Sequence, residues 1–537
     1  MSSLGRASAV IAAGTMVSRV TGLLRSIVLV GVLGSISQAA DAFTVANQLP
    51  NSVFQLISVG VLTAVIVPQI VKATAKPDGG GPFISKMFTL GVVVLLVCTA
   101  IAMIAAPGLV WLATSEKQQE LRALAIAFAY WCLPQILFYG VYALLGETLN
   151  ARRVFGPFTW APVINNIVSI AGFLALGAVF HEVPRSAASW TPQMVAILGG
   201  TATLGIALQA LVLLVFWRRT GLSLRPDFHW RGAGLGTVGR LAGWTMLMAL
   251  AGIAAGFFQS SVATTASGAG ASSTVLANAW LVFMLPYSVI VLSIGTPYFT
   301  QISEHAAAGR HDEVRADITR SIRTLVFFIM AAIAAVAAAT FPASRVFSSN
   351  LNEAFGAAPV LVAYLIGLLP LTVLFIVQRT FYAYDDTRTP FWFTIFQCAL
   401  VVGTALLASL LYSLDVIPVT LLAAGVALGQ SIASTLQTVI AIWLLHRKIG
   451  GLQIGSWMSA IGRFAVAAVP AGLAGWGVFL LLGGTEGWTM SGQLLGAIGT
   501  CIIGAVVVVV YIGILALMRA PELTVAGSML RRFLPGR

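Results

Sequence analysis

The chain is built from long apolar runs that are separated by short polar loops. A transmembrane helix needs about 20 consecutive apolar residues, and fourteen runs reach that length. In chain order, the expected spans are residues 8–33, 42–71, 85–113, 122–146, 159–180, 194–217, 237–266, 272–301, 321–343, 356–378, 391–413, 417–445, 460–482 and 492–518. The sequence therefore predicts an all-α polytopic membrane protein with 14 transmembrane helices.

The composition leaves no room for a soluble domain. Hydrophobic residues make up 58% of the chain and charged residues only 9%, whereas soluble proteins average about 25% charged residues. The four cysteines lie in apolar runs without CxxC spacing, at Cys98, Cys132, Cys398 and Cys501. We expect them to be small hydrophobic residues rather than disulfide partners or metal ligands.

The basic residues alternate between loops in a way that predicts the topology. With the N-terminus in the cytoplasm, the cytoplasmic segments carry 24 of the 30 Lys and Arg residues and the external loops carry 4. The remaining two are Arg19 and Arg25. The positive-inside rule explains this pattern and the net charge of +13 better than nucleic-acid binding does. We expect both termini to face the cytoplasm.

Two sequence matches indicate an internal duplication. The LPNSV segment at Leu49–Val53 resembles the LPYSV segment at Leu285–Val289, with the prolines 236 residues apart. The surroundings of Pro157 and Pro390 also resemble each other, 233 residues apart. A repeat that holds six spans keeps its orientation, so we expect two parallel six-helix lobes, an architecture found in transporters. The alternative is chance recurrence in an apolar chain.

The duplication suggests three parts. We expect residues 1–220 to form the N-terminal lobe and residues 221–450 to form the C-terminal lobe. Residues 451–537 would add two further C-terminal helices and a cytoplasmic tail.

Charged residues inside spans are the first candidates for a functional site. Arg19 and Arg25 lie in the first apolar run, and Asp41 lies at the start of the second. A charge at the bilayer centre costs roughly 2.5–3.5 kcal/mol on insertion scales. Six residues turn a helix by about 240°, so the two arginines do not share one narrow stripe. Arg25 lies near mid-span, and its planar guanidinium suits a phosphate. The alternative is an ion pair of Asp41 with either arginine.

Uncharged polar residues extend this candidate site. Asn47, Gln48 and Gln259 lie inside expected spans and could line a polar cavity, although interhelical hydrogen bonding is the commoner role of such residues.

Four prolines lie inside expected helices, at Pro50, Pro134, Pro286 and Pro370. Each removes a backbone hydrogen bond. We consider them either as hinges for alternating access or as static kinks, which transmembrane helices tolerate.

Known catalytic motifs are absent from the sequence. It contains neither a GxxxxGK[ST] phosphate-binding motif nor an HExxH metal-binding motif, and its five histidines lie in loops or at span ends. We therefore expect no enzymatic activity, no metal and no cofactor. Transport would draw its energy from an ion gradient, the membrane potential or the substrate gradient.

Five segments together resemble the MurJ (MviN) family, the lipid II flippases of the multidrug/oligosaccharidyl-lipid/polysaccharide exporter superfamily. In chain order they are SRVTGLLR, DAFTVANQLPN, LNARRVFGPFTWAPVINN, GRHDE and FYAYDDTRTP. The resemblance extends over the whole chain and includes the fourteen spans.

The resemblance implies a transport function in the bacterial plasma membrane. It implies two lobes around a cationic central cavity, with the last two helices forming a groove for a polyprenyl tail. The substrate would be the undecaprenyl-pyrophosphate-linked peptidoglycan precursor, moved from the inner to the outer leaflet by alternating access. Arg25 and Arg19 would neutralise the pyrophosphate. Membrane lipids and cell-wall synthesis proteins would be further partners, and no nucleic acid is expected.

The chain also departs from the family pattern. Phe54 and Gln55 stand where the family often has an arginine, and Leu281 and Met284 stand where it often has an arginine and an acid. One alternative is therefore a flippase for another polyprenyl-linked glycan. Another is a drug/cation antiporter of the same superfamily, which needs a carboxylate in the membrane.

Overall fold

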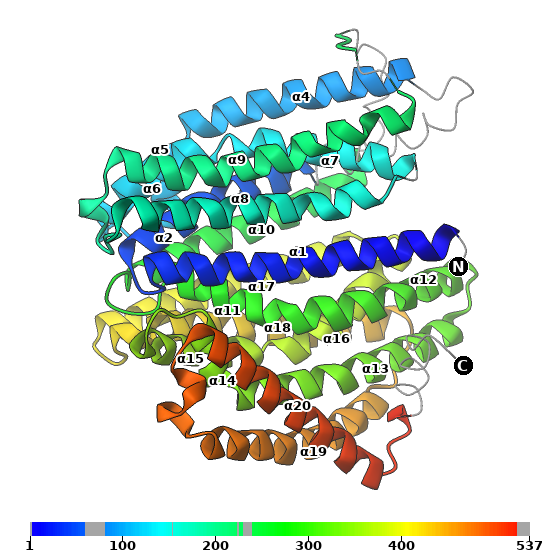
Figure 1. Cartoon of the computed structure of the whole chain (residues 1–537). Coiled ribbons are helices and arrows are strands. Elements are labelled where there is room, and N and C mark those ends of the chain that lie inside the picture. Colours follow the sequence, from blue (N-terminus) through cyan, green and yellow to red (C-terminus); the bar gives the residue numbers. More distant parts are fainter. Residues whose placement is uncertain (1–2, 59–80, 153, 223–224, 229–238, 524–537) are drawn as a thin grey trace. The chain divides into compact units, whose positions relative to one another are not determined.

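The computed structural model describes residues 3–58, 81–152, 154–222, 225–228 and 239–523, and every regular element in them is a helix (Figure 1). Among the described residues, the α-helices up to residue 264 are α1 (Ser3–Leu33), α2 (Gln38–Ile57), α4 (Gly81–Ile104), α5 (Ala106–Ala113), α6 (Gln119–Cys132), α7 (Gln135–Ala151), α8 (Gly156–Phe180), α9 (Pro192–Trp217) and α10 (Gly239–Thr264). The later ones are α11 (Ser273–Pro286), α12 (Ser293–Ala307), α13 (His311–Ala338), α14 (Thr340–Val346), α15 (Leu351–Leu365), α16 (Leu368–Ala383), α17 (Arg388–Ser413), α18 (Val419–Lys448), α19 (Ile454–Leu481) and α20 (Gln493–Leu517).

The all-α membrane fold predicted from the apolar runs is confirmed. Among the described residues, 13 helical segments are long and apolar enough to cross a membrane. The expected span over residues 42–71 begins within α2 and continues into residues 59–80, which lie outside the described residues. The count of 14 transmembrane helices therefore stays a prediction.

The chain divides into two compact units, residues 1–268 and 269–537. Helix α10 packs on α2 and α5 and so belongs to the first unit. Helices α19 and α20 pack on each other and on α13 in the second unit. The three-part division at residues 220 and 450 remains a prediction about functional lobes.

The two units repeat the same order of helix packing. In the first unit α2 packs on α6, α7 on α9, and α8 on α9. In the second unit the corresponding pairs are α11 with α15, α16 with α18, and α17 with α18. This correspondence supports the duplication that the LPxSV segments indicate.

Three of the four prolines coincide with interrupted helices. Pro134 separates α6 from α7, and α16 begins two residues before Pro370, after a turn. Pro286 ends α11 and is followed by a π-helical segment, Tyr287–Leu292, which leads into α12. Pro50 lies inside the continuous helix α2. Proline cannot donate the backbone hydrogen bond at these points, and a hinge role for them stays a prediction.

Aromatic side chains form the centre of the first unit. The Phe43 ring of α2 meets the Phe128 ring of α6 edge-on, with ring centroids 5.4 Å apart, and the Phe173 ring of α8 at 6.2 Å. The first unit is thus held by apolar packing across α2, α6 and α8.

In the second unit, polar groups fasten the last two helices to α13. The Tyr511 hydroxyl on α20 donates to the Phe327 carbonyl at 3.0 Å, and the Trp457 indole on α19 donates to the Thr319 hydroxyl at 3.1 Å. These bonds tie both helices to the body of the second unit.

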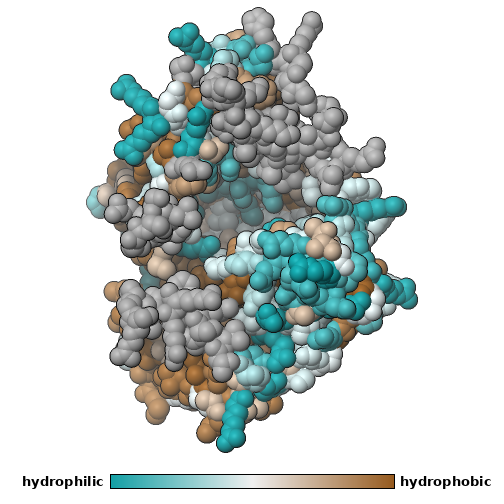
Figure 2. All heavy atoms as spheres, turned by 90° about the vertical axis from the view of Figure 1, so that its right-hand side faces the viewer, coloured by the Kyte–Doolittle hydropathy of each residue, from teal (hydrophilic) through white to brown (hydrophobic). Residues whose placement is uncertain are grey.

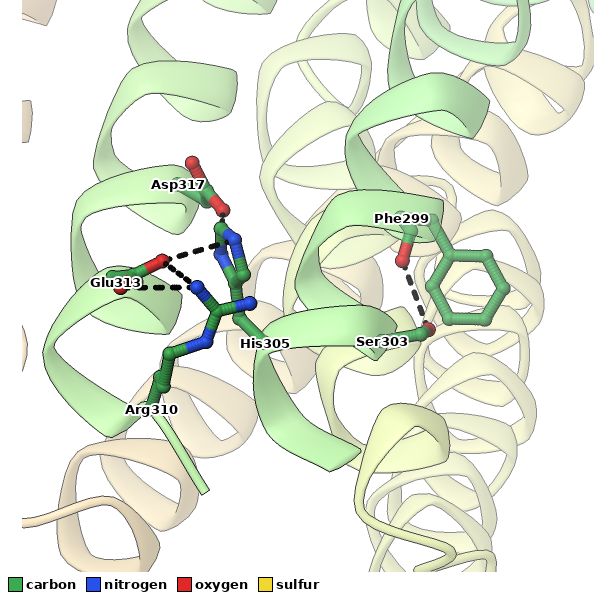
Figure 3. A network of polar contacts seen from close by, with 6 residues as sticks. All are labelled: Phe299, Ser303, His305, Arg310, Glu313 and Asp317. Carbon is green, nitrogen blue, oxygen red and sulfur yellow. Dashed lines mark hydrogen bonds and ion pairs between the residues drawn. The ribbon is translucent and has the colours of Figure 1, made fainter. Parts of the chain in front are cut away.

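One end of the second unit carries a network of charged residues. His305 of α12 places Nδ1 2.7 Å from Asp317 Oδ2 and Nε2 3.0 Å from Glu313 Oε2, both on α13 (Figure 3). Arg323 of α13 lies 2.5 Å from the Glu522 carboxylate beyond α20. Figure 2 views the molecule from this end and shows hydrophilic side chains gathered there. These residues belong to segments that the charge pattern assigns to the cytoplasm.

We expect Gly475→Ala to destabilise the packing of α19. A Cβ at Gly475 would overlap the Val507 side chain of α20 and lie 2.9 Å from the Ala338 Cβ of α13. Such overpacking costs about 1–3 kcal/mol, so the unfolding temperature of the purified protein in detergent should fall.

The matched control is Gly477→Ala in the same helix, because a Cβ there meets no atom within 4 Å. Its unfolding temperature should stay the same or rise, since alanine favours a helix over glycine. Equal melting of both variants would contradict this packing of α19.

Candidate anion-binding site

Helix α1 is positioned by close packing against α8. The Asn166 amide of α8 donates to the Ser18 carbonyl at 3.1 Å and to the Thr21 hydroxyl at 3.0 Å. These bonds fix the rotation of α1 about its axis. As a result, Arg25, one turn beyond Thr21, is turned into the first unit.

Arg25 lines a small polar cavity inside the first unit. The cavity has a volume of about 50 Å³, which is room for a few waters. Its walls come from five helices: Arg25, Ser26 and Leu29 of α1, Phe43 and Asn47 of α2, Gln135 and Tyr139 of α7, Asn165, Ser169 and Phe173 of α8, and Ala202 and Ile206 of α9. A cavity of this size suits one ionic group rather than a sugar.

Gln135 organises the uncharged polar wall of this cavity. Its Nε2 donates to Asn47 Oδ1 at 3.1 Å and to the Thr203 hydroxyl at 3.2 Å. Its Oε1 is buried and has no hydrogen-bond partner in the described part of the chain. The break at Pro134 starts α7 at Gln135 and so places this side chain opposite α2.

The charge of Arg25 is not neutralised by a carboxylate. Within the described ranges, its guanidinium makes no hydrogen bond and no ion pair, although the side chain is half-buried. The cavity holds amides and hydroxyls around it but no acidic residue. A cation in such a place favours an anion, and its forked donors match a phosphate.

The other predicted site residues lie at different places in the first unit. Arg19 is exposed on α1, as expected from its rotation relative to Arg25. Asn47 lines the cavity with Arg25, whereas its neighbour Gln48 is exposed. Gln259 is half-buried on α10 and is not a lining residue. The structure thus brings together only Arg25 and Asn47 of the six predicted residues.

Asp41 lies in the first turn of α2, away from the cavity lining. Its carboxylate is fully buried and accepts a hydrogen bond of 2.5 Å from the Ser267 hydroxyl, in the segment after α10. The Gln38 side chain nearby accepts from the Ala187 amide and donates to Gln118. Asp41 therefore belongs to the polar contacts that close this end of the unit, and in the described chain it forms no ion pair with Arg25.

The sequence interpretation did not select Gln135 or Tyr139 as site residues. A glutamine directly after an intramembrane proline was the available signal for Gln135. No local signal marks Tyr139, which lines the cavity and stacks on the Phe54 ring at a centroid distance of 5.7 Å. Phe54, which stands where the resembling family often has an arginine, is thus part of an aromatic pair beside the cavity.

The second unit contains an apolar groove of about 780 Å³. Its walls come from α13, α14, α15, α17 and α18, and Trp476 is the contribution of α19. No residue of α20 lines it. The tail groove that the last two helices are expected to form stays a prediction.

Sequence comparisons with known proteins indicate one family. A family model described as lipid II flippase MurJ matches residues 30–491. A relative from Haemophilus influenzae, named probable lipid II flippase MurJ, is 25% identical over 498 residues, which cover 86% of this chain and 90% of the relative.

Two solved structures share the fold. A structure of lipid II flippase MurJ in an inward closed conformation matches with a TM-score of 0.64 and 18% identity, over 92% of this chain and 98% of that one. An inward-facing multidrug resistance transporter of the MATE family matches with a TM-score of 0.63 and 17% identity, over 81% and 94%. Because multidrug transporters share this fold, the fold alone does not select a substrate.

Substitution of Gln135 tests the cavity. Gln135→Leu removes both amide hydrogen bonds and leaves the Asn47 oxygen unpaired, which costs about 1–3 kcal/mol. Gln135→Glu loses the same two N–H donors, but it places a carboxylate in the cavity that Arg25 lines, and the ion pair can offset that loss. We expect the leucine variant to melt at a lower temperature than wild type and the glutamate variant to melt near or above it. Equal destabilisation of the two variants would contradict an unpaired guanidinium in this cavity.

Proposed function

This chain belongs to the lipid II flippase MurJ family, and we propose that it moves lipid II from the inner to the outer leaflet of the bacterial plasma membrane by alternating access. Lipid II is the undecaprenyl-pyrophosphate-linked peptidoglycan precursor. The family match begins at residue 30, so the case for Arg25 rests on the geometry of its cavity.

The observation that carries the proposed mechanism is a cation in the membrane without a carboxylate partner. The headgroup of lipid II carries a pyrophosphate and sugars, whose transfer into hydrocarbon without compensation is prohibitive. The Arg25 guanidinium can form charge-assisted hydrogen bonds to the pyrophosphate and neutralise part of its charge. The polyprenyl tail can stay in lipid throughout, so the protein has to shelter only the headgroup.

The size of the Arg25 cavity supports a model in which the cavity takes the phosphate and the rest of the headgroup stays outside it. About 50 Å³ accommodates a phosphate oxygen and waters but no sugar. The amides of Gln135 and Asn47 keep the cavity polar, so that Arg25 stays hydrated when no substrate is bound. The exposed Arg19 would meet the anionic headgroup before Arg25 does, and the proposal assigns the sugars and peptide to space outside this cavity.

The remaining assignments belong to the same proposal. Gln48 and Gln259 would line the substrate path at other depths, whereas the buried Asp41 would hold the start of α2 beside that path through Ser267. Pro50, Pro134, Pro286 and Pro370 would allow the helices to bend between states. The last two helices would guide the tail; Val469 and Leu473 of α19 and Val509 of α20 are exposed apolar residues suited to this. Both termini would face the cytoplasm.

The chain is a transporter in a bacterial membrane, and we propose that it has no catalytic activity of its own. The described residues contain no group of three or more His, Cys, Asp or Glu side chains that could hold a metal ion. Cell-wall synthesis proteins that consume the translocated precursor are the proposed partners.

One observation favours a second substrate. The Phe54–Tyr139 stack occupies a place where the family often has an arginine, so the headgroup meets fewer cations here. A flippase for another polyprenyl-linked glycan is therefore the alternative. The drug/cation antiporter is less well supported, since Asp41 is engaged with Ser267 at the end of α2.

Depletion of the protein in its own host should make lipid II accumulate in the inner leaflet. The reason is that synthesis continues while the headgroup cannot cross. Lipid II on each side of the membrane can be measured by its accessibility to an external lipid II-cleaving enzyme. Normal outer-leaflet levels after depletion would reject this substrate, and rescue by an authentic lipid II flippase would confirm it over another glycan.

Arg25→Ala should reduce translocation by about tenfold or more, because a charge-assisted hydrogen bond to the pyrophosphate is lost. Arg25→Lys should retain part of the activity, since a point charge replaces a bidentate fork. Protein levels in the membrane serve as the control. Full activity of Arg25→Ala would remove the anion site from the mechanism.

A further inference from the structure

Helix α12 of the second unit exposes a polar face. Its exposed residues include Thr296, Thr300 and Glu304. By contrast, α17 of the same unit exposes Trp392, at 57%, and Leu406, at 53%. Exposed apolar side chains suit hydrocarbon, whereas an exposed carboxylate such as that of Glu304 needs water. The Thr296 and Thr300 hydroxyls donate to backbone carbonyls one turn earlier, so Glu304 is the residue that requires water. The α12 face is therefore water-accessible rather than lipid-facing.

Arg379 is the exposed residue of the neighbouring helix α16. Every other residue of α16 is buried or half-buried. The Arg379 guanidinium lies 5.2 Å from the ring centroid of Phe299 on α12 and 5.4 Å from that of Phe375 on α16. The absence of a side chain at Gly295 lets the Phe375 ring pack directly against α12. Two rings on two helices thus hold one cation in place.

The hydrogen-bond donors of Arg379 remain open. In the part of the chain that the structure describes, Arg379 forms no ion pair and no hydrogen bond. Its neighbour Gln378 donates to the Tyr382 hydroxyl at 2.9 Å, so these two polar groups satisfy each other. The contacts of the guanidinium with the Phe299 and Phe375 rings use none of its N–H groups as hydrogen-bond donors to oxygen, so these donors can serve a ligand.

Two acidic residues of α13, Glu313 and Asp317, do not compete for Arg379. His305 is directed towards α13 and occupies both Glu313 and Asp317, whereas the Phe299 ring points away from α13 (Figure 3). The polar network and the Arg379 clamp therefore lie on different sides of α12.

We propose that Arg379 is an anion-binding residue of the second unit and holds the diphosphate of the lipid-linked substrate. This inference rests on the proposed flippase function and deepens it. Helix α11 of this unit carries no charged residue. Arg379 supplies a cation to this unit from a different helix, α16, at the wetted face beside α12.

Membrane phospholipids also carry phosphate, so Arg379 has to be distinguished from an arginine that binds phospholipid headgroups. Arg447 has the surroundings expected of such an arginine. Arg447 of α18 lies 4.0 Å from the ring centroid of Trp443, which is 50% exposed, and Val439 one turn earlier is 58% exposed. This arginine extends an apolar face, as interfacial residues do. Arg379 instead belongs to a polar face, which favours the headgroup of a transported lipid.

The test measures binding to the purified full-length protein in lipid nanodiscs. One titration uses undecaprenyl diphosphate and the other uses phosphatidylglycerol. The variants are Arg379→Gln, Arg379→Lys and the control Arg447→Gln, which removes the same charge from a ring-stacked arginine. We expect Arg379→Gln to weaken diphosphate binding by about tenfold or more, Arg379→Lys to weaken it less, and Arg447→Gln to leave it unchanged. Phosphatidylglycerol binding and the unfolding temperature should not change in Arg379→Gln.

Three results would overturn the inference. They are unchanged diphosphate binding in Arg379→Gln, an equal loss in Arg447→Gln, and a parallel loss of phosphatidylglycerol binding, which would assign Arg379 to bulk lipid. Failure of the wild-type protein to bind undecaprenyl diphosphate or lipid II would instead reject the proposed function itself. If the wild-type protein binds undecaprenyl diphosphate and the Arg379→Gln variant binds it equally well, only the role of Arg379 is rejected.

Discussion

The candidate site of the first unit depends on one guanidinium that lines a polar cavity without a carboxylate in its walls. An arginine in an ion pair with a carboxylate would only hold two helices together. An arginine without such a partner, surrounded by amides, can exchange bound water for an anion. The bonds from Asn166 to α1 and from Gln135 to α2 hold the walls of this cavity in position. The proposed anionic ligand would explain why so costly a side chain is present there.

The duplicated packing provides the same scaffold twice, but the two copies carry different chemistry. In the first unit the cation is Arg25 of α1, and it lines a cavity whose walls come from five helices. In the second unit Arg379 lies on an exposed face and is held by aromatic rings. Apolar helix contacts set the positions of the helices and tolerate such divergence, because lipid-facing and core residues need only volume and hydrophobicity. The charged residues can therefore move between helices without altering the fold.

The candidate site was only partly predictable from the sequence. Arg25 stood out because its burial cost is evident from the apolar run around it, and Asn47 followed as a polar residue inside a span. Asp41 looked like a partner for Arg25, yet the first turn of α2 places its carboxylate against Ser267. Gln135 and Tyr139 come from a helix far along the chain, and no spacing rule relates them to Arg25.

The sequence by itself determined the class of the protein, the positions of most helices, the division between loops and spans, and the presence of a costly intramembrane cation. Run length, charge and proline position are local properties, so each can be read without knowing what packs against what. Only the tertiary structure decided which polar side chains share a cavity with Arg25 and that Arg379 lies over the rings of Phe299 and Phe375. Those outcomes depend on the rotation of each helix about its axis, and that rotation is set by contacts between residues distant in the chain.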